Sequence, residues 1–456
     1  MQGAPAITPG GVFPYGNITV APACRRMDIA MPTNTTKLNP DTIDSPAMRS
    51  AGRELLSLAL MDARNHTLQL LTRHEDALAG QDDGLDPDDA ALPSAETQTP
   101  VPSASPRWLA GPGGWSAERW IGRNTQRALG ATCPQQPTRL ASIQPEADGW
   151  WNPLLDDQGG GAAPDTVDTR SFLLESLEST LELLEKSAED DGALYFYRLA
   201  LFHEDLCGEA LVVQAQTRGV ALAIDLPQAV QAAEPVRLPA TRWTLGMPQG
   251  GFAFDIEQGA LALDVPDFEI DAQPVSWAQY VEFVADGGYD REDLWQPAGW
   301  AWLQQAAQTQ GRRGPRHVER IGAASGAVMQ NRFGKQVRMA ARQTAMHLNW
   351  WEADAWCRWA GRRLPSEVEW EVAAHHGARQ GFRWGDVHEW VANTLHPWDG
   401  YQSGPWAEYS GPFLGKARVL RGASFATRAR MKHPRFRGFA LPEWDEGFVG
   451  FRSCAL

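Results

Sequence analysis

Hydrophobic residues recur at helical spacing in the first half of the chain. Ser45 followed by Pro46 is typical of the start of a helix, and leucines crowd the residues that follow, up to Leu71. Acidic, Pro-rich and Gly-rich stretches separate the later helical segments, and such stretches predict loops. The later helices are predicted over residues 117–129, 169–186 and 193–217. Four helices joined by irregular loops indicate a helical bundle.

The pattern changes after Leu226. Apolar segments shorten, Gly and Trp become frequent, and few long apolar stripes remain. Alternating residues predict a strand over 261–268, and short helices are predicted over 274–285 and 350–360. We therefore expect three parts: a disordered arm rich in Pro, Thr, Asn and Gly (residues 1–45), a helical bundle (46–226) and an α+β domain with much irregular structure (227–456).

Composition argues against several classes of protein. The chain has 456 residues, enough for about two or three domains, and no apolar run approaches the roughly 18 residues of a membrane span. Its 41 Lys and Arg against 56 Asp and Glu give a net charge of -15, which argues against general binding to a phosphate backbone. The cysteines form no CxxC pair, and we see no secretory signal. We expect a cytoplasmic protein that binds small molecules, with no nucleic-acid or membrane partner.

The last predicted helix carries a candidate metal-binding pair. His203 and Cys207 are four residues apart, so both side chains lie on one face of the helix and can reach one ion. Two residues alone are a weak indication of a metal site. A free cysteine is commonly a small buried apolar residue, so a purely structural role for Cys207 stays open.

An ordered set of motifs in the second half carries a family resemblance. The motifs are GRRLPSEVEWE (361–371), WGDVHEW (384–390), LRGASF (420–425) and GFR (450–452). Together they resemble the formylglycine-generating-enzyme-like fold of the sulfatase-modifying-factor family, which implies a C-type-lectin-like domain. Each motif is also explained by packing, through buried Arg/Glu pairs and Trp side chains. The motifs therefore identify a fold and do not by themselves identify a reaction.

Motifs in the helical half narrow the resemblance. The segments 62–68 (DARNHTL) and 120–124 (WIGRN) look like the DinB-like bundle that is fused to this fold in ergothioneine-pathway sulfoxide synthases. Two further segments, 196–205 and 268–277, are similar to the selenoneine synthase branch of that family. The resemblance covers residues 46–456. It implies a multidomain α and α+β protein, with an N-terminal DinB-like four-helix bundle before the formylglycine-generating-enzyme-like domain.

The resemblance also implies a chemistry and a set of metal ligands. Family members hold a non-haem iron(II) with three histidines, bind O2 at the iron, and couple a selenosugar or thiol donor to the imidazole ring of hercynine (trimethylhistidine) in an oxidative step. In this chain His203 matches the first ligand of the HxxxHxE motif and Glu209 closes the motif. Cys207 stands in place of the second histidine, and Pro112, after Gly111, stands in place of the third.

The same resemblance suggests where the substrate binds. The residues expected to contact it are Leu395, Phe439, Trp444 and Asp445. Leu395 replaces a tyrosine of the ergothioneine-forming relatives, which is compatible with the selenoneine branch. His388 stands where the family usually has Trp, and Ser116 where it usually has Phe. Several pocket positions therefore depart from the family pattern.

Two functions from different classes follow. The first is an iron-dependent enzyme that forms a C–Se or C–S bond on hercynine. The second is a catalytically inactive or metal-altered homologue that acts as a binding or regulatory protein. Pro112 and Cys207 favour the second function, because the loss of two ligands costs more affinity than the roughly 10- to 100-fold of an outer-shell change. A changed metal site that uses Cys207, with zinc in place of iron, is a third alternative.

Overall fold

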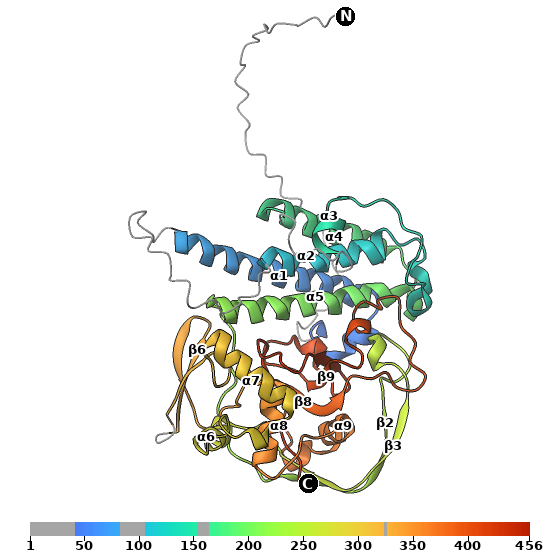
Figure 1. Cartoon of the computed structure of the whole chain (residues 1–456). Helices are drawn as coiled ribbons and strands as arrows, with labels where there is room; N and C mark the ends of the chain where they lie inside the picture. Colours follow the sequence, from blue (N-terminus) through green and yellow to red (C-terminus); the bar gives the residue numbers. More distant parts are fainter. Residues whose placement is uncertain (1–41, 83–104, 153–163, 323–325) are drawn as a thin grey trace, which may run out of the picture. The chain divides into compact units, whose positions relative to one another are not determined.

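The computed structural model describes residues 42–82, 105–152, 164–322 and 326–456. Helices occupy the upper part of Figure 1, and the short strands and helices of the second half lie below the long helix α5 (Asp191–Arg218). The expected mixture of helices and short strands is present, and the expected domain limits stay predictions. The expected arm, residues 1–45, falls outside the described residues except for 42–45, so the prediction of disorder stays untested.

The bundle consists of long helices that begin and end at recognisable signals. The helices are α1 (Arg53–Asp82), α2 (Pro106–Ala117), the short α3 (Ala147–Trp151), α4 (Thr166–Glu185) and α5, and a 3-10 turn (Pro46–Ser50) precedes them. Asp165 and Asp190 accept hydrogen bonds from backbone N–H groups in the first turns of α4 and α5. Helix α5 ends at Arg218 and is followed by Gly219, whose φ of 70° suits the residue after a helix. Helices α1 and α2 pack against α5.

The second predicted helix was placed wrongly. Residues 117–129 form the end of α2, a π-helical turn (Glu118–Gly122) and part of a 3-10 helix (Arg127–Thr132), whereas α2 itself begins at Pro106. The glycines and Pro112 inside α2 hide its helical pattern. The glycines are required, because a Cβ on Gly111 would collide with Trp151 and one on Gly113 with Glu204. The missed signal was Ser105 before Pro106, since Ser105 caps this helix.

The second half contains small sheets joined by irregular segments. One sheet has the order β10-β9-β8-β11, with β8 (His388–Thr394), β9 (Arg418–Gly422), β10 (Arg437–Ala440) and β11 (Val449–Phe451). In it, β11 runs parallel to β8 and the other pairs are antiparallel. The other described sheets pair β1 (Val236–Leu238) with β4 (Phe268–Ile270), β2 (Thr241–Leu245) with β3 (Leu261–Val265), and β5 (Val318–Gly322) with β6 (Ala327–Arg332) and β7 (Lys335–Met339).

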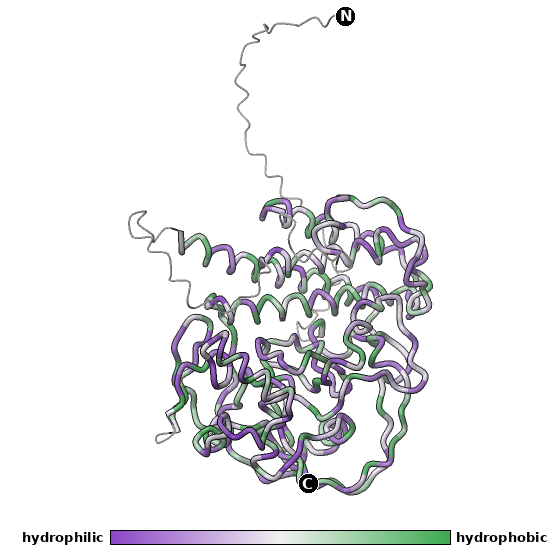
Figure 2. The backbone as a smooth tube through the Cα atoms, viewed as in Figure 1, coloured by the Kyte–Doolittle hydropathy of each residue, from purple (hydrophilic) through white to green (hydrophobic). Residues whose placement is uncertain are grey.

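The described residues of this half also form the α-helices α6 (Trp277–Ala285), α7 (Pro297–Gln310), α8 (Trp350–Trp359) and α9 (Glu367–His376). The helices expected over 274–285 and 350–360 correspond to α6 and α8, and the strand expected over 261–268 corresponds to β3. Figure 2 shows hydrophobic and hydrophilic residues mixed along every helix of the bundle. No helix among the described residues has the length and apolar character that a membrane crossing requires.

A buried arginine joins the two halves. Arg430, in the segment between β9 and β10, has no exposed surface, and its guanidinium forms two hydrogen bonds of 2.7 and 2.8 Å with Asp205 of α5. It also donates to Asp62 of α1 at 2.9 Å. Removal of the guanidinium would leave the buried Asp205 carboxylate without its counter-charge, whereas Asp62 would keep its ion pair with Arg428.

We expect Arg430→Ala to lower the free energy of unfolding by about 3–5 kcal/mol, because the buried Asp205 carboxylate loses its counter-charge. Urea unfolding followed by circular dichroism measures this loss. Arg291→Ala is the control, since Arg291 pairs with Asp286 and Asp293 at the surface and its loss should leave the midpoint unchanged. Equal midpoints for the two variants would show that Arg430 does not hold the halves together.

Candidate functional site

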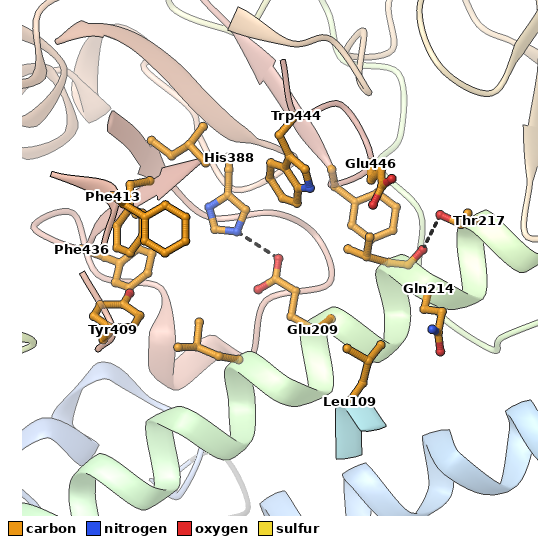
Figure 3. Close-up of a pocket in the computed structure, with 17 residues that line it drawn as sticks. Leu109, Glu209, Gln214, Thr217, His388, Tyr409, Phe413, Phe436, Trp444 and Glu446 are labelled. Carbon is orange, nitrogen blue, oxygen red and sulfur yellow. Dashed lines mark hydrogen bonds and ion pairs between the residues drawn. The ribbon is translucent and has the colours of Figure 1, made fainter. Parts of the chain in front are cut away.

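The main pocket lies between α5 and the sheet of β8, β9 and β10. Its volume is about 500 Å³. One wall is formed by a stripe of α5 that includes Leu206, Glu209 and Val213, and Leu109 of α2 adds to it. The opposite walls come from the second half and carry His388, Leu420, Phe436, Phe439, Trp444, Glu446 and Phe448, together with Tyr409 and Phe413. Figure 3 shows these side chains around the open space above α5.

A polar cluster sits at the floor of the pocket. The Glu209 carboxylate accepts hydrogen bonds from Ser424 Oγ at 2.6 Å, from Thr427 Oγ1 at 2.9 and 3.0 Å, and from His388 Nε2 at 2.9 Å. Burial opposes ionisation of Glu209, but these donors outweigh burial and hold the pKa of the carboxyl below its usual range. Glu209 is therefore an anion that is fully hydrogen-bonded by the second half of the chain.

The rest of the pocket is aromatic and carries a second acidic group. Tyr409 and Phe413 both pack against Phe439, with ring centroids 5.2 and 5.1 Å apart. In Figure 3, Tyr409 and Phe413 lie on one side of His388, and Trp444 and Glu446 lie on the other side. Burial raises the pKa of Glu446. The pocket thus offers aromatic faces next to a carboxyl group, which suits a ligand that is both cationic and apolar.

The candidate metal ligands lie beside the pocket and do not line it. His203 Nε2 is 3.8 Å from the Cys207 sulfur, and the His203 ring packs on Trp406 with centroids 4.6 Å apart. Burial lowers the pKa of His203 to about 4 and raises the pKa of the Cys207 thiol. At neutral pH the pair is therefore an uncharged imidazole and a protonated thiol.

The position expected for a third ligand holds no donor. Pro112 is inside α2, and the neighbouring backbone of Gly113 hydrogen-bonds to the Cys207 thiol. In the part of the chain that the structure describes, no three His, Cys, Asp or Glu side chains gather closely enough to hold a metal ion. A thiolate rather than a thiol binds metals, and an iron(II) site of this family type needs three ligands. The residues present do not fit iron(II).

Of the four residues expected to bind the substrate, two line the pocket and two do not. Phe439 and Trp444 line the pocket. Asp445 is buried directly beside it, where its carboxylate binds Arg312 at 2.6 Å and Arg316 at 2.5 Å. Leu395 is fully buried among apolar residues and is not among the residues that line the pocket. Their roles in binding stay predictions.

Sequence reasoning did not find several residues of the pocket wall. Glu446 and Phe448 follow Trp444 closely in the chain, and Phe436 precedes Phe439 by three residues. The signal in the sequence was the concentration of aromatic and acidic residues over residues 436–448, from just before β10 to just before β11. Tyr409 had no such signal, because it lies in an irregular segment between β8 and β9.

Comparisons with known proteins place this architecture in a family. The profile of the "Sulfatase-modifying factor enzyme 1-like domain" matches residues 226–386. A "Hercynine oxygenase" from Mycolicibacterium smegmatis is 29% identical over 340 residues, which cover 62% of this chain and 77% of the relative. Another from Mycolicibacterium thermoresistibile is 27% identical over 465 residues, covering 88% of this chain and 94% of the relative. Residues 226–386 therefore match a sulfatase-modifying-factor domain, and the chain as a whole is similar to hercynine oxygenases.

These matches confirm the resemblance carried by the motifs of the second half. A "Formylglycine-generating enzyme" from Streptomyces coelicolor is 26% identical, with an alignment that covers 51% of this chain and 96% of that enzyme. A domain comparable in extent to that whole enzyme is therefore present here. The profile does not include the bundle, so the description of the bundle as DinB-like stays a prediction, with which the observed helices are compatible.

We expect the Cys207 thiol of the native protein to resist alkylation. Because burial raises its pKa, iodoacetamide at pH 8 should leave it unmodified in native protein and modify it fully in urea. Peptide mass spectrometry of the two samples measures the difference, and the urea sample is the control for reactivity of the same peptide. Rapid labelling of native Cys207 would instead indicate an accessible thiolate, which a metal could bind.

Proposed function

We propose that the pocket beside α5 binds hercynine, the trimethylammonium betaine of histidine. The observation that carries this proposal is the composition of the wall, where the rings of Phe439, Trp444 and Phe448 lie in the same pocket as the Glu446 carboxyl. A quaternary ammonium group has no hydrogen to donate, so proteins bind it with the faces of aromatic rings and with negative charge. The volume of about 500 Å³ is in the range of small-ligand sites.

The relatives support a reaction class. Two of them are named hercynine oxygenases, and we propose an oxidative reaction on hercynine for this chain as well. Within that class, the finer proposal is formation of a C–Se or C–S bond between hercynine and a selenosugar or thiol donor, with O2 as the oxidant. That finer reaction needs a redox-active metal, for which iron(II) is the family expectation.

A specific observation favours a second candidate, a metal-free binding or regulatory homologue. The pair formed by His203 and Cys207 is uncharged and buried, and Pro112 supplies no third ligand. An iron(II) ion placed there would have two ligands at most from the positions that match the family motif, and one of them would have to lose a proton in an apolar environment. Binding of hercynine in the pocket does not depend on such an ion, so both candidates share the same ligand.

We expect isothermal titration calorimetry to detect hercynine binding to the purified chain, and Trp444→Ala to weaken it about 5- to 30-fold through loss of a cation–π contact. Trp243→Ala is the matched control, because Trp243 packs on His375 and His376 and is not part of the pocket wall. Binding that is absent from the parent chain, or equally weakened in both variants, would refute the assignment of this pocket.

Anaerobic loading with iron(II), followed by desalting and metal analysis, decides between the two candidates. We expect the parent chain to retain much less than one equivalent of iron. The double variant Pro112→His with Cys207→His should retain about one equivalent, because it restores the three imidazoles of the family site. Stoichiometric iron in the parent chain would refute the second candidate. A double variant that stays free of iron would refute the alignment of the ligand positions.

A further inference from the structure

His388 is the basic side chain in the wall of the main pocket, and its hydrogen bonds fix how it meets a ligand. Its Nε2 is 2.9 Å from Glu209 Oε1. Both Glu209 oxygens accept hydrogen bonds from Thr427, and Oε1 also accepts one from Ser424, so the carboxylate is the acceptor and Nε2 carries the proton in this contact. In the neutral imidazole, Nδ1 is then a bare acceptor, since the partner of one ring nitrogen sets the tautomer of the other.

The Nδ1 atom is available to a ligand. It has no hydrogen-bond partner among the residues that the structure describes, and it is not among the polar atoms that are fully enclosed. Figure 3 shows the His388 ring at the open space, with its Nε2 directed to Glu209. Most of the remaining wall is hydrocarbon or aromatic, so an acceptor at this point distinguishes ligands that can donate a hydrogen bond there from ligands that cannot.

The contact between His388 and Glu209 also has a purely structural explanation. Glu209 is on α5 and His388 is on β8, 179 residues further along the chain, so their contact also holds the two halves together. That explanation requires Nε2 only. It predicts that any side chain able to donate to Glu209 can replace His388, whatever ligand is bound.

We infer that His388 is a specificity-determining residue, which accepts a hydrogen bond from a ring N–H of the ligand while the ligand's ammonium group lies against Trp444 and Glu446. This inference rests on the proposed function, because it states which side chain hydrogen-bonds to the imidazole of hercynine. Glu209 fixes the acceptor tautomer, and Ser424 and Thr427 keep Glu209 in place. The ligand class is a trimethylammonium betaine that carries a heteroaromatic N–H group.

Two substitutions separate the two nitrogens of His388. The amide of a glutamine superposes on Nε2, so His388→Gln keeps a donor to Glu209 and removes the acceptor at the position of Nδ1. The amide of an asparagine superposes on Nδ1, so His388→Asn keeps an acceptor toward the pocket and removes the contact with Glu209. A structural role requires the first contact, and the inferred role requires the second.

The experiment compares the affinities of two ligands for the parent chain and for both variants. Hercynine has the ring N–H, whereas phenylalanine betaine has the same trimethylammonium and carboxylate groups on a phenyl ring. We expect the parent chain to bind hercynine about tenfold more tightly, and His388→Gln to lose this tenfold preference while its affinity for phenylalanine betaine is unchanged. His388→Asn should keep most of the preference but melt at a lower temperature. Calorimetry and thermal denaturation measure these quantities.

Several results would overturn the inference. They are a parent chain that binds the two betaines equally, a His388→Gln variant that keeps the preference, and a variant that loses both ligands equally. The comparison of the two ligands in the parent chain needs no variant, so it tests the inference even if a substitution prevents folding. A parent chain that binds neither betaine overturns the proposed function and this inference together. Binding of both with equal affinity overturns the inference alone.

Discussion

Helix α5 is packed on nearly all sides, and its acidic side chains therefore need partners from the surrounding elements. Glu204 pairs with Arg64 of α1 at 2.9 Å, and Asp205 pairs with Arg430 of the second half at 2.7 Å. Glu209 takes its donors from the second half as well. A buried charge without a partner costs several kcal/mol, so these pairs fix the rotation of α5 relative to both halves. In this rotation Leu206, Glu209 and Val213 of α5 face the pocket and form one of its walls.

The sequence predicts most of the bundle because local signals mark its helices. Asp190 caps α5 and Gly219 follows its end, so the predicted and observed limits differ by only a few residues. The sequence does not predict helix α2, because glycines and Pro112 have low helix propensity. Two of these glycines are explained by tertiary packing, Gly111 against Trp151 and Gly113 against Glu204. The small sheets of the second half depend on pairing between distant segments, which local patterns do not encode.

The candidate site could be predicted only in part for the same reason. The resemblance pointed to Phe439 and Trp444, which line the pocket, and to Leu395, which lies in the core. The contact between Glu209 and His388 joins residues 179 positions apart, and no pattern along the chain reveals it. A motif such as HxxxHxE states which residue types occur, whereas their chemistry depends on burial and on partners supplied by the other half.

The positions that match the metal ligands are separate from the pocket wall. In a protein whose ligand binds to a metal ion, the ion supplies much of the orientation, and the walls need only exclude water. Here neither His203 nor Cys207 lines the pocket, and His203 packs on Trp406, whose ring stacks 4.8 Å from Tyr409 of the pocket wall. Orientation of a ligand must then come from the walls themselves. The polar groups that remain in those walls, chiefly His388 and the carboxyl of Glu446, are the ones that could supply it, and their placement among aromatic side chains restricts which ligand can use them.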